Sequence, residues 1–282
     1  MSYTYTLRKG DEGQEVKRLQ SKLSIKADGD FGKNTDAAVQ AYQNSNGLLV
    51  DGIAGPVTLG SLGIPVLAGI DVSAWNGNID WPDVKSGGTK YAWVKVTEGR
   101  THTNKPYKRN IEGCRKNDIV VGGYHFGRPD TGIDNGLRKD AIAEAQHFLS
   151  KLQPLLKPGD LIPVLDVEAG MKTDDQHNVD WNLAWLEYVE SEIGVKPMVY
   201  TARWAVQLYL AKASKASLQE LAKYPLWWAS YNEGADPKRK PGKIWEEWDV
   251  WQWTGHGSIQ GIKGRCDQNW LAGGKLNDIL IP

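Results

Sequence analysis

The hydrophobic pattern divides the chain into a short part with helical spacing and a longer part in which strand and helix signals alternate. Within Glu12–Leu23, apolar residues recur every three or four positions, which predicts an amphipathic helix. A second apolar face follows at Ala37, Ala38, Ala41 and Tyr42. We expect this part to be a compact bundle of about three short helices.

The longer part follows a glycine-rich stretch, Leu59–Gly69, and contains every tryptophan of the chain, the first being Trp75. This step in composition predicts a small all-α domain over residues 1–65 and a second domain over residues 66–282. In the small domain the motif D-G-x-x-G-x-x-T occurs twice, at 28–35 and 51–58. Each copy predicts a tight turn followed by a helix start.

In the longer part, apolar strand-like runs alternate with helical patterns, of which the clearest are Leu137–Leu152 and Trp181–Ile193. This alternation predicts an α/β fold with a mainly parallel sheet, either open or closed into a barrel, and helices outside it. In a barrel, the active site lies at the carboxyl ends of the strands. The expected strands are Val66–Val72, Tyr91–Val96, Ile119–Phe126, Leu161–Glu168, Pro197–Thr201, Pro225–Tyr231 and Asp249–Trp253.

Polar residues end several of these strands, and Asp166 and Glu168 are the most informative pair. Residues two apart on a strand point to the same face, about 6.6 Å apart along the backbone. Two carboxylates on one face repel each other, so at least one should have a raised pKa. A carboxylic acid that stays protonated near neutral pH is what a glycosidase needs to protonate its leaving oxygen. The motif alone is more typical of a solvated loop, but its position after an apolar strand favours a site.

Composition changes this picture in three ways. The 34 basic and 34 acidic residues balance, so we expect no nucleic acid partner, and no apolar run is long enough for a membrane span. The two cysteines, Cys114 and Cys266, exclude a disulfide scaffold and a four-cysteine zinc site, and we expect both to be free and buried. The chain has 13 Trp against 3 Phe, a bias that suits stacking on sugar rings, although core packing should account for about half of them.

Other chemistries have little support in the sequence. The five histidines show no H-E-x-x-H or other close metal-ligand spacing, and we expect no metal and no cofactor. Neither a G-x-S-x-G elbow nor a phosphate-binding loop is present. Cys114 is expected on an outer helix, and His125, at a strand end, could serve either the structure or the substrate. The histidines are His102, His125, His147, His177 and His256.

Two resemblances connect these patterns with known families. The segments LRKGDEGQEVKRLQSKL and DGDFGKNTDAAVQAYQNSNGLLVDGIAGPVTLGSL, within residues 5–63, resemble the helical peptidoglycan-binding domain of cell-wall hydrolases. Residues 68–282 resemble glycoside hydrolase family 25, the phage and bacterial lysozymes. The motifs that carry this second resemblance are, in order, GIDVSAWNGNIDW, YAWVKVTEG, GGYHFGRP, PVLDVE, MVYT, PLWWASY, WQW and CDQNW.

The resemblances imply a wall-targeting module joined to an irregular (β/α) TIM-like barrel. Such a barrel would hydrolyse the β-1,4 bond between N-acetylmuramic acid and N-acetylglucosamine. Glu168 would then be the general acid and Asp166 the residue that assists it, while Asp71 and Asp267 would be further acidic residues of the site. Glu98, in the T-E-G motif, would support substrate binding. The candidates for the sugar-binding walls are Tyr124, Tyr200, Trp228 and Trp251.

We therefore expect a muramidase in which Glu168 is the general acid. The substrate's own N-acetyl group would attack the sugar carbon, and Asp166 would orient that N-acetyl group. A covalent aspartyl intermediate and direct attack by water are the alternatives. The N-terminus shows no secretory signal, so we expect a phage endolysin, made in the host cytoplasm, that reaches the periplasmic wall after release. We expect a monomer whose partner is bacterial peptidoglycan. A chitinase-like enzyme, a glucosaminidase or a non-catalytic wall-binding protein remain open as alternatives.

Overall fold

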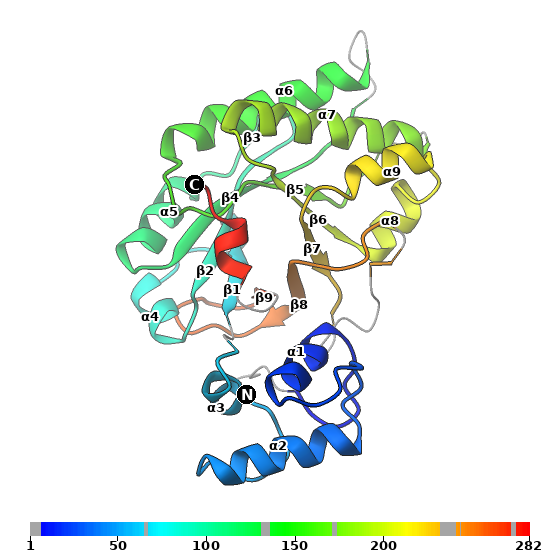
Figure 1. Cartoon of the computed structure of the whole chain (residues 1–282). Coiled ribbons are helices and arrows are strands. Elements are labelled where there is room, and N and C mark those ends of the chain that lie inside the picture. Colours follow the sequence, from blue (N-terminus) through cyan, green and yellow to red (C-terminus); the bar gives the residue numbers. More distant parts are fainter. Residues whose placement is uncertain are drawn as a thin grey trace.

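The computed structural model describes residues 7–64, 67–130, 136–170, 174–231, 241–242, 244–271 and 275–282. Figure 1 shows a small helical unit beside a barrel of strands that is surrounded by helices. The expected division between residues 65 and 66 lies outside the described residues. The helical unit has its own apolar core, built around Val16, Leu19, Phe31 and Leu59. Its three helices are α1 (Gln14–Lys22), α2 (Lys33–Ser45) and α3 (Pro56–Ser61), as expected.

A buried glutamine explains the repeated D-G-x-x-G-x-x-T motif. The Gln20 side-chain amide donates hydrogen bonds to Asp28 Oδ1, to the Asp30 carbonyl and to Thr35 Oγ1, and it accepts one from the Gly29 amide. Gly29 has a φ of +85°, which favours glycine at this turn. The second copy repeats these contacts with Gln43, Asp51, Ile53, Thr58 and Gly52. The motif therefore encodes a turn that is fixed by the preceding helix.

The same contacts correct the expected apolar face of α2. The buried row of this helix is Thr35, Val39 and Gln43, whereas Ala37 and Ala41 are exposed. Polar side chains occupy core-facing positions because their hydrogen-bonding groups are satisfied by the turns. Hydrophobic spacing alone therefore selected the wrong face of α2.

Eight strands close the barrel, and all seven expected strands are among them. Neighbours pair in parallel from β1 to β8, and β9 closes the barrel antiparallel to both β8 and β1. The sequence did not indicate β9 as a strand. A two-residue strand, β3 (His102–Thr103), pairs with the end of β2 outside the barrel. The barrel strands are β1 (Ala68–Val72), β2 (Tyr91–Glu98), β4 (Val120–Phe126), β5 (Val164–Val167), β6 (Met198–Ala202), β7 (Leu226–Ala229), β8 (Val250–Gly257) and β9 (Cys266–Leu271).

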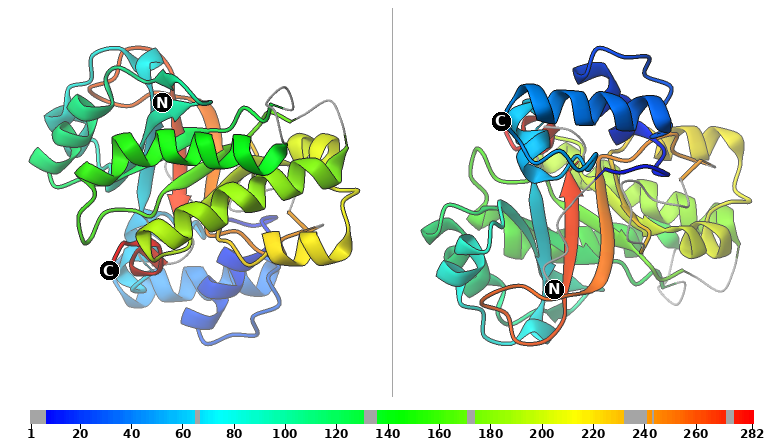
Figure 2. Two further views of the ribbon diagram at one scale, coloured as in Figure 1. Left: turned by 90° about the horizontal axis from the view of Figure 1, so that it is seen from above. Right: turned by 90° about the horizontal axis from the view of Figure 1, so that it is seen from below.

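Helices lie outside the barrel, with α6 and α7 packed side by side over one flank (Figure 2). The helix expected over 137–152 has those bounds, and the one expected from Trp181 begins earlier, at Asp175. It starts there because the Asp174 side chain accepts a hydrogen bond from the His177 amide and caps it. The helices are α4 (Trp81–Ser86), α5 (Tyr107–Lys116), α6 (Leu137–Leu152), α7 (Asp175–Ile193), α8 (Arg203–Tyr209) and α9 (Lys215–Leu221). The 3₁₀ turns are η1 (Ala74–Asn76), η2 (Gln153–Leu155) and η3 (Lys275–Ile279).

Two apolar layers stabilise the barrel: one packs between the strands and the outer helices, and the other fills the interior of the barrel. Ten of the thirteen tryptophans are buried, so core packing accounts for more of them than the expected half. Trp270 of β9 packs both on the outer layer and on the core of the helical unit, and thereby joins the two parts. Cys114, on α5, and Cys266 are both buried and free, as expected. No helix within the described ranges is long and apolar enough to cross a membrane.

Candidate active site

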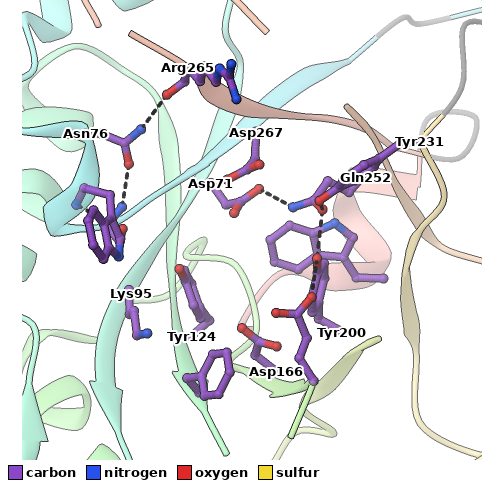
Figure 3. Close-up of a pocket in the computed structure, with 15 residues that line it drawn as sticks. Asp71, Asn76, Lys95, Tyr124, Asp166, Tyr200, Tyr231, Gln252, Arg265 and Asp267 are labelled. Atoms are coloured by element: carbon purple, nitrogen blue, oxygen red, sulfur yellow. Dashed lines mark hydrogen bonds between the residues drawn. The ribbon is translucent and has the colours of Figure 1, made fainter. Parts of the chain in front are cut away.

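A cavity of about 320 Å³ lies at the carboxyl ends of the barrel strands, where a barrel places its active site (Figure 3). Four carboxyl groups line it, together with two cations and several aromatic rings. The strands supply most of these side chains from inward-facing positions, and the connecting segments supply the rest. The lining residues are Asp71, Ser73, Trp75, Asn76, Lys95, Tyr124, Phe126, Asp166, Glu168, Tyr200, Trp227, Tyr231, Gln252, Arg265 and Asp267.

Asp71 and Asp267 form one pair of carboxyl groups. They lie directly opposite each other on the antiparallel strands β1 and β9, and both line the cavity. Burial and the Asp267 charge raise the pKa of Asp71 well above its ordinary value of 3.8. Asn269 and Gln252 both donate to Asp71 Oδ1, at 2.8 and 3.0 Å. Because two neighbouring carboxylates repel each other, the raised pKa of Asp71 favours a state in which Asp71 keeps its proton and Asp267 is ionised.

Asp166 and Glu168 form the second pair, at the end of β5, and both line the cavity as their spacing predicted. Burial, and then the Glu168 charge, raise the pKa of Asp166 well above its ordinary value. Asp166 Oδ1 is buried and forms no hydrogen bond with any residue that the structure describes. Burial also raises the pKa of the half-buried Glu168, and the Asp267 charge adds to that rise. An unpartnered buried acceptor therefore lies next to a carboxyl that resists ionisation.

Tyr200 and Gln252 connect the two pairs. The Tyr200 hydroxyl lies 2.8 Å from Gln252 Oε1 and 3.3 Å from Glu168 Oε1. It has a single proton, and the shorter contact with Gln252 is favoured. The longer contact, in which Tyr200 donates to Glu168, is weaker and lowers the pKa of Glu168, while the Gln252 amide donates to Asp71. Tyr231 adds a second donor to Gln252 Oε1, at 2.9 Å. The network therefore links Glu168 to Asp71, and burial, which raises the pKa of Glu168, outweighs the opposing effect of the Tyr200 hydroxyl.

Lys95 is a cation of the cavity lining whose charge lowers the pKa of Asp166 and Glu168, and Glu98 holds it by an ion pair. Glu98 binds Lys95 at 2.6 Å and Arg128 at 2.7 Å. Burial alone would raise the pKa of Glu98, but hydrogen bonds from these two cations lower it. Both cations lie on the Phe126 ring, at 4.6 and 4.4 Å from its centroid. Glu98 itself does not line the cavity, and it acts there through Lys95.

The proposed sugar-binding walls are only partly at the cavity. Tyr124 and Tyr200 line it, whereas Trp228 and Trp251 are buried in the outer layer between strands and helices. Successive residues of a strand face opposite sides, so Trp227 points inward where Trp228 points outward. Trp227 stacks on Trp93 with ring centroids 4.7 Å apart and forms the aromatic floor of the cavity.

Sequence reasoning missed several lining residues. Gln252 lies in the W-Q-W motif, and its inward position could have been found from the alternation of β8. Lys95 alternates in the same way with its apolar neighbours on β2. Trp75 and Arg265 lie outside the barrel strands, and strand alternation gives no signal for them.

His125 has a structural role. It is fully buried and contacts Thr97 Oγ1 and Glu144 Oε2, each at 2.8 Å. Burial lowers the pKa of His125 to about 3, so it is neutral at pH 7. Among the residues that the structure describes, no group of three or more His, Cys, Asp or Glu side chains could hold a metal ion.

Comparison with known families matches both parts of the chain. The profile described as "Glycosyl hydrolases family 25" matches residues 70–262, and that described as "Putative peptidoglycan binding domain" matches residues 12–62. The first match includes Asp71, Asp166 and Glu168, while Asp267 lies five residues beyond its end.

Individual relatives agree with the family match. The chain is 30% identical to "Uncharacterized protein YegX" of Escherichia coli strain K12, over 77% of this chain and 75% of that protein. It is 26% identical to "Lysozyme M1" of Streptomyces globisporus, over 83% and 78%. The crystal structure of the bacterial lysozyme from Streptomyces coelicolor superposes with a TM-score of 0.63 at 25% identity, over 74% of this chain and 93% of that one.

Replacing Asp71 tests the proton that we place on it. Asp71 keeps its proton to a higher pH in the folded than in the unfolded chain, so wild-type stability falls as pH rises from about 3.8 through the folded pKa. Asp71→Asn can keep every hydrogen bond without a titrating group. We expect it to melt higher than wild type at pH 7, by about 2–4 °C per kcal/mol recovered, and to lose this gain near pH 4.

Calorimetric melting curves between pH 4 and 8 measure this difference. Asp180→Asn, on the exposed surface of α7, is the matched control and should shift the melting temperature little at any pH. A gain for Asp71→Asn that does not change with pH, or a loss at pH 7, would contradict a protonated Asp71.

Proposed function

We propose a role for each carboxyl of the cavity from one premise: the chain belongs to glycosyl hydrolases family 25. It is a peptidoglycan-hydrolysing muramidase of the lysozyme type. We propose that the bond it cuts is the β-1,4 link between N-acetylmuramic acid and N-acetylglucosamine. The observation that best supports a glycosidase mechanism is the half-buried Glu168, because burial raises its pKa and favours its acid form against the opposing hydrogen bond from Tyr200.

In this proposal Glu168 is the general acid. It protonates the glycosidic oxygen as the bond to C1 breaks, and the resulting carboxylate later takes a proton from the incoming water. The surrounding negative charge supports this role, because Asp267 makes ionisation of Glu168 less favourable before the reaction. After proton transfer, Lys95 and the Tyr200 hydroxyl are close enough to stabilise the Glu168 carboxylate.

Asp166 then orients the substrate's own N-acetyl group. Its buried Oδ1 lacks a hydrogen-bond partner in the described chain, and an amide N–H of the sugar would supply one. The acetamido oxygen attacks C1 and forms a cyclic intermediate whose positive charge the Asp166 carboxylate offsets. A carboxyl with a raised pKa can serve here because Lys95 favours its ionised form. Asp71 and Asp267 would form the opposite wall of the cavity and keep the electrostatic potential there negative.

The small helical part would serve as the wall anchor. We propose a division into residues 1–65, which bind peptidoglycan, and residues 66–282, which hydrolyse it. Binding to a polymer raises the local concentration of substrate around a tethered enzyme. The modular layout also supports our proposal that the protein acts as a phage endolysin on the wall. We propose that it works as a monomer, since one chain supplies every residue of the cavity.

Removing the acid should stop turnover. We expect Glu168→Gln to lower the rate of wall hydrolysis by at least about 10²-fold, because an amide cannot protonate the leaving oxygen. The wild-type rate should fall as pH rises through the elevated pKa of Glu168. The measurement is the release of reducing sugar ends from purified peptidoglycan, with the melting temperature as the test of folding.

Glu192→Gln, on the exposed end of α7, is the control and should keep the wild-type rate. A folded Glu168→Gln enzyme with wild-type turnover would exclude Glu168 as the acid. The configuration of the wild-type product separates the two-step routes, through the N-acetyl group or a covalent aspartyl intermediate, from direct attack by water: NMR of the fresh sugar end should show the β configuration. An α product would mean direct attack by water.

Deleting residues 1–65 should affect polymeric substrate most. Loss of the wall anchor removes the tethering effect, so activity on whole walls should fall at least about tenfold more than activity on short soluble muropeptides. Rates on the two substrates are compared for the full and shortened chains. Equal losses on both would show a structural role instead, exerted through the contact of Trp270 with the helical core.

A further inference from the structure

Trp75 is displayed to solvent at the wall of the cavity. Its side chain is 95% exposed, whereas ten of the other tryptophans are buried. An indole left in water forgoes the stabilisation that burial would give, and its flat face at the cavity is free to stack on a planar group or a sugar ring. The roles proposed above for the carboxyl groups leave Trp75 unused.

The turn that carries Trp75 is firmly built. In η1 the Ser73 amide donates to Asn76 Oδ1 at 2.8 Å, and the Trp75 amide donates to Ser73 Oγ at 3.3 Å. The Ala74 amide donates to Asn104 Oδ1 at 3.2 Å, which fixes the turn to the segment after β3. Ser73 and Asn76 are themselves buried. The backbone beneath the indole is therefore fixed before any ligand binds, which lowers the entropic cost of binding.

Arg265 lies beside this turn, because Asn76 Nδ2 donates to the Arg265 carbonyl at 3.2 Å (Figure 3). Its exposed guanidinium lines the cavity and forms no hydrogen bond or ion pair with the described residues. Lys95, the other cation of the lining, is already bound to Glu98. Arg265 is thus the cation of the lining that is available to an anionic ligand, while the four carboxyls would repel such a ligand elsewhere.

We propose that Trp75 and Arg265 form an outer subsite for a carboxylate-bearing sugar of the glycan strand. The indole packs on the face of the ring, and the guanidinium binds the carboxylate through two parallel hydrogen bonds. This inference rests on the proposed function, which makes the ligand a muramic acid residue. Its carboxylate is supplied either by the free lactyl group or by the attached stem peptide. N-Acetylglucosamine has no carboxylate, so Arg265 fixes the register of the strand in the cavity.

The test uses three forms of one glycan preparation with the full-length enzyme. The first form carries stem peptides, and the second is stripped of them by an amidase, which frees the lactyl carboxylates. The third is the stripped glycan with its carboxylates converted to methylamides. We expect Arg265→Gln to raise KM about tenfold on the form whose carboxylate is bound, with kcat unchanged, and to leave KM on the methylamide form unchanged. Trp75→Ala should raise KM on all three forms.

Control variants and the pattern of outcomes distinguish failure of the Trp75–Arg265 subsite from failure of the proposed function. Lys263→Gln and Trp204→Ala change an exposed cation and a half-exposed indole outside the cavity lining, and they should leave KM unchanged. A rise confined to the first form assigns the stem-peptide carboxylate, and a rise on the second assigns the lactyl group. An equal effect of Arg265→Gln on all three forms, or no effect of either variant, overturns the subsite. Failure of the wild-type enzyme on every form would instead overturn the proposed function.

Discussion

Four carboxyl groups gathered in one partly buried cavity cannot all be ionised, and the chemistry of the protein depends on this constraint. Burial raises the pKa of Asp71, Asp166, Glu168 and Asp267, and repulsion among them adds to the rise for three of them. The raised pKa values favour protonation of some of these carboxyls, and the charge of Lys95 favours ionisation of Asp166 and Glu168. The acid form that catalysis needs is thus favoured by the same crowding that makes the cluster costly to build.

The barrel sets which carboxyls meet. Because β9 runs antiparallel to β1, Asp267 lies opposite Asp71, and its charge raises the pKa of Asp71. Parallel pairing of β5 with β6 places Tyr200 beside Asp166, where its hydroxyl can reach both Glu168 and Gln252. The reversed strand also carries Trp270, which packs against the helical unit, so catalysis and attachment of that unit depend on the same strand.

The strands and the main carboxyl pair could be predicted from the sequence, whereas the residues that face the cavity or the core depended on how the elements pair in the fold. Apolar runs marked the seven expected strands, and the D-x-E spacing placed Asp166 and Glu168 in one cavity. Trp228 was predicted at the sugar-binding wall, but its neighbour Trp227 lines the cavity instead. Two adjacent tryptophans look alike in the sequence, and only pairing with the neighbouring strands fixes which of them faces inward. The inner face of α2 was missed because Gln43 is buried by hydrogen bonds that span eight to fifteen residues. Long-range polar contacts of this kind leave no hydrophobic period.

The most direct test of the account is to identify the bond that is cut. Purified peptidoglycan is digested, the new sugar ends are reduced with borohydride, and the fragments are identified by mass spectrometry. A protonated Glu168 acting on the muramic acid link predicts reduced muramic acid ends. Reduced glucosamine ends, or new amino and peptide carboxyl ends without sugar cleavage, would contradict it.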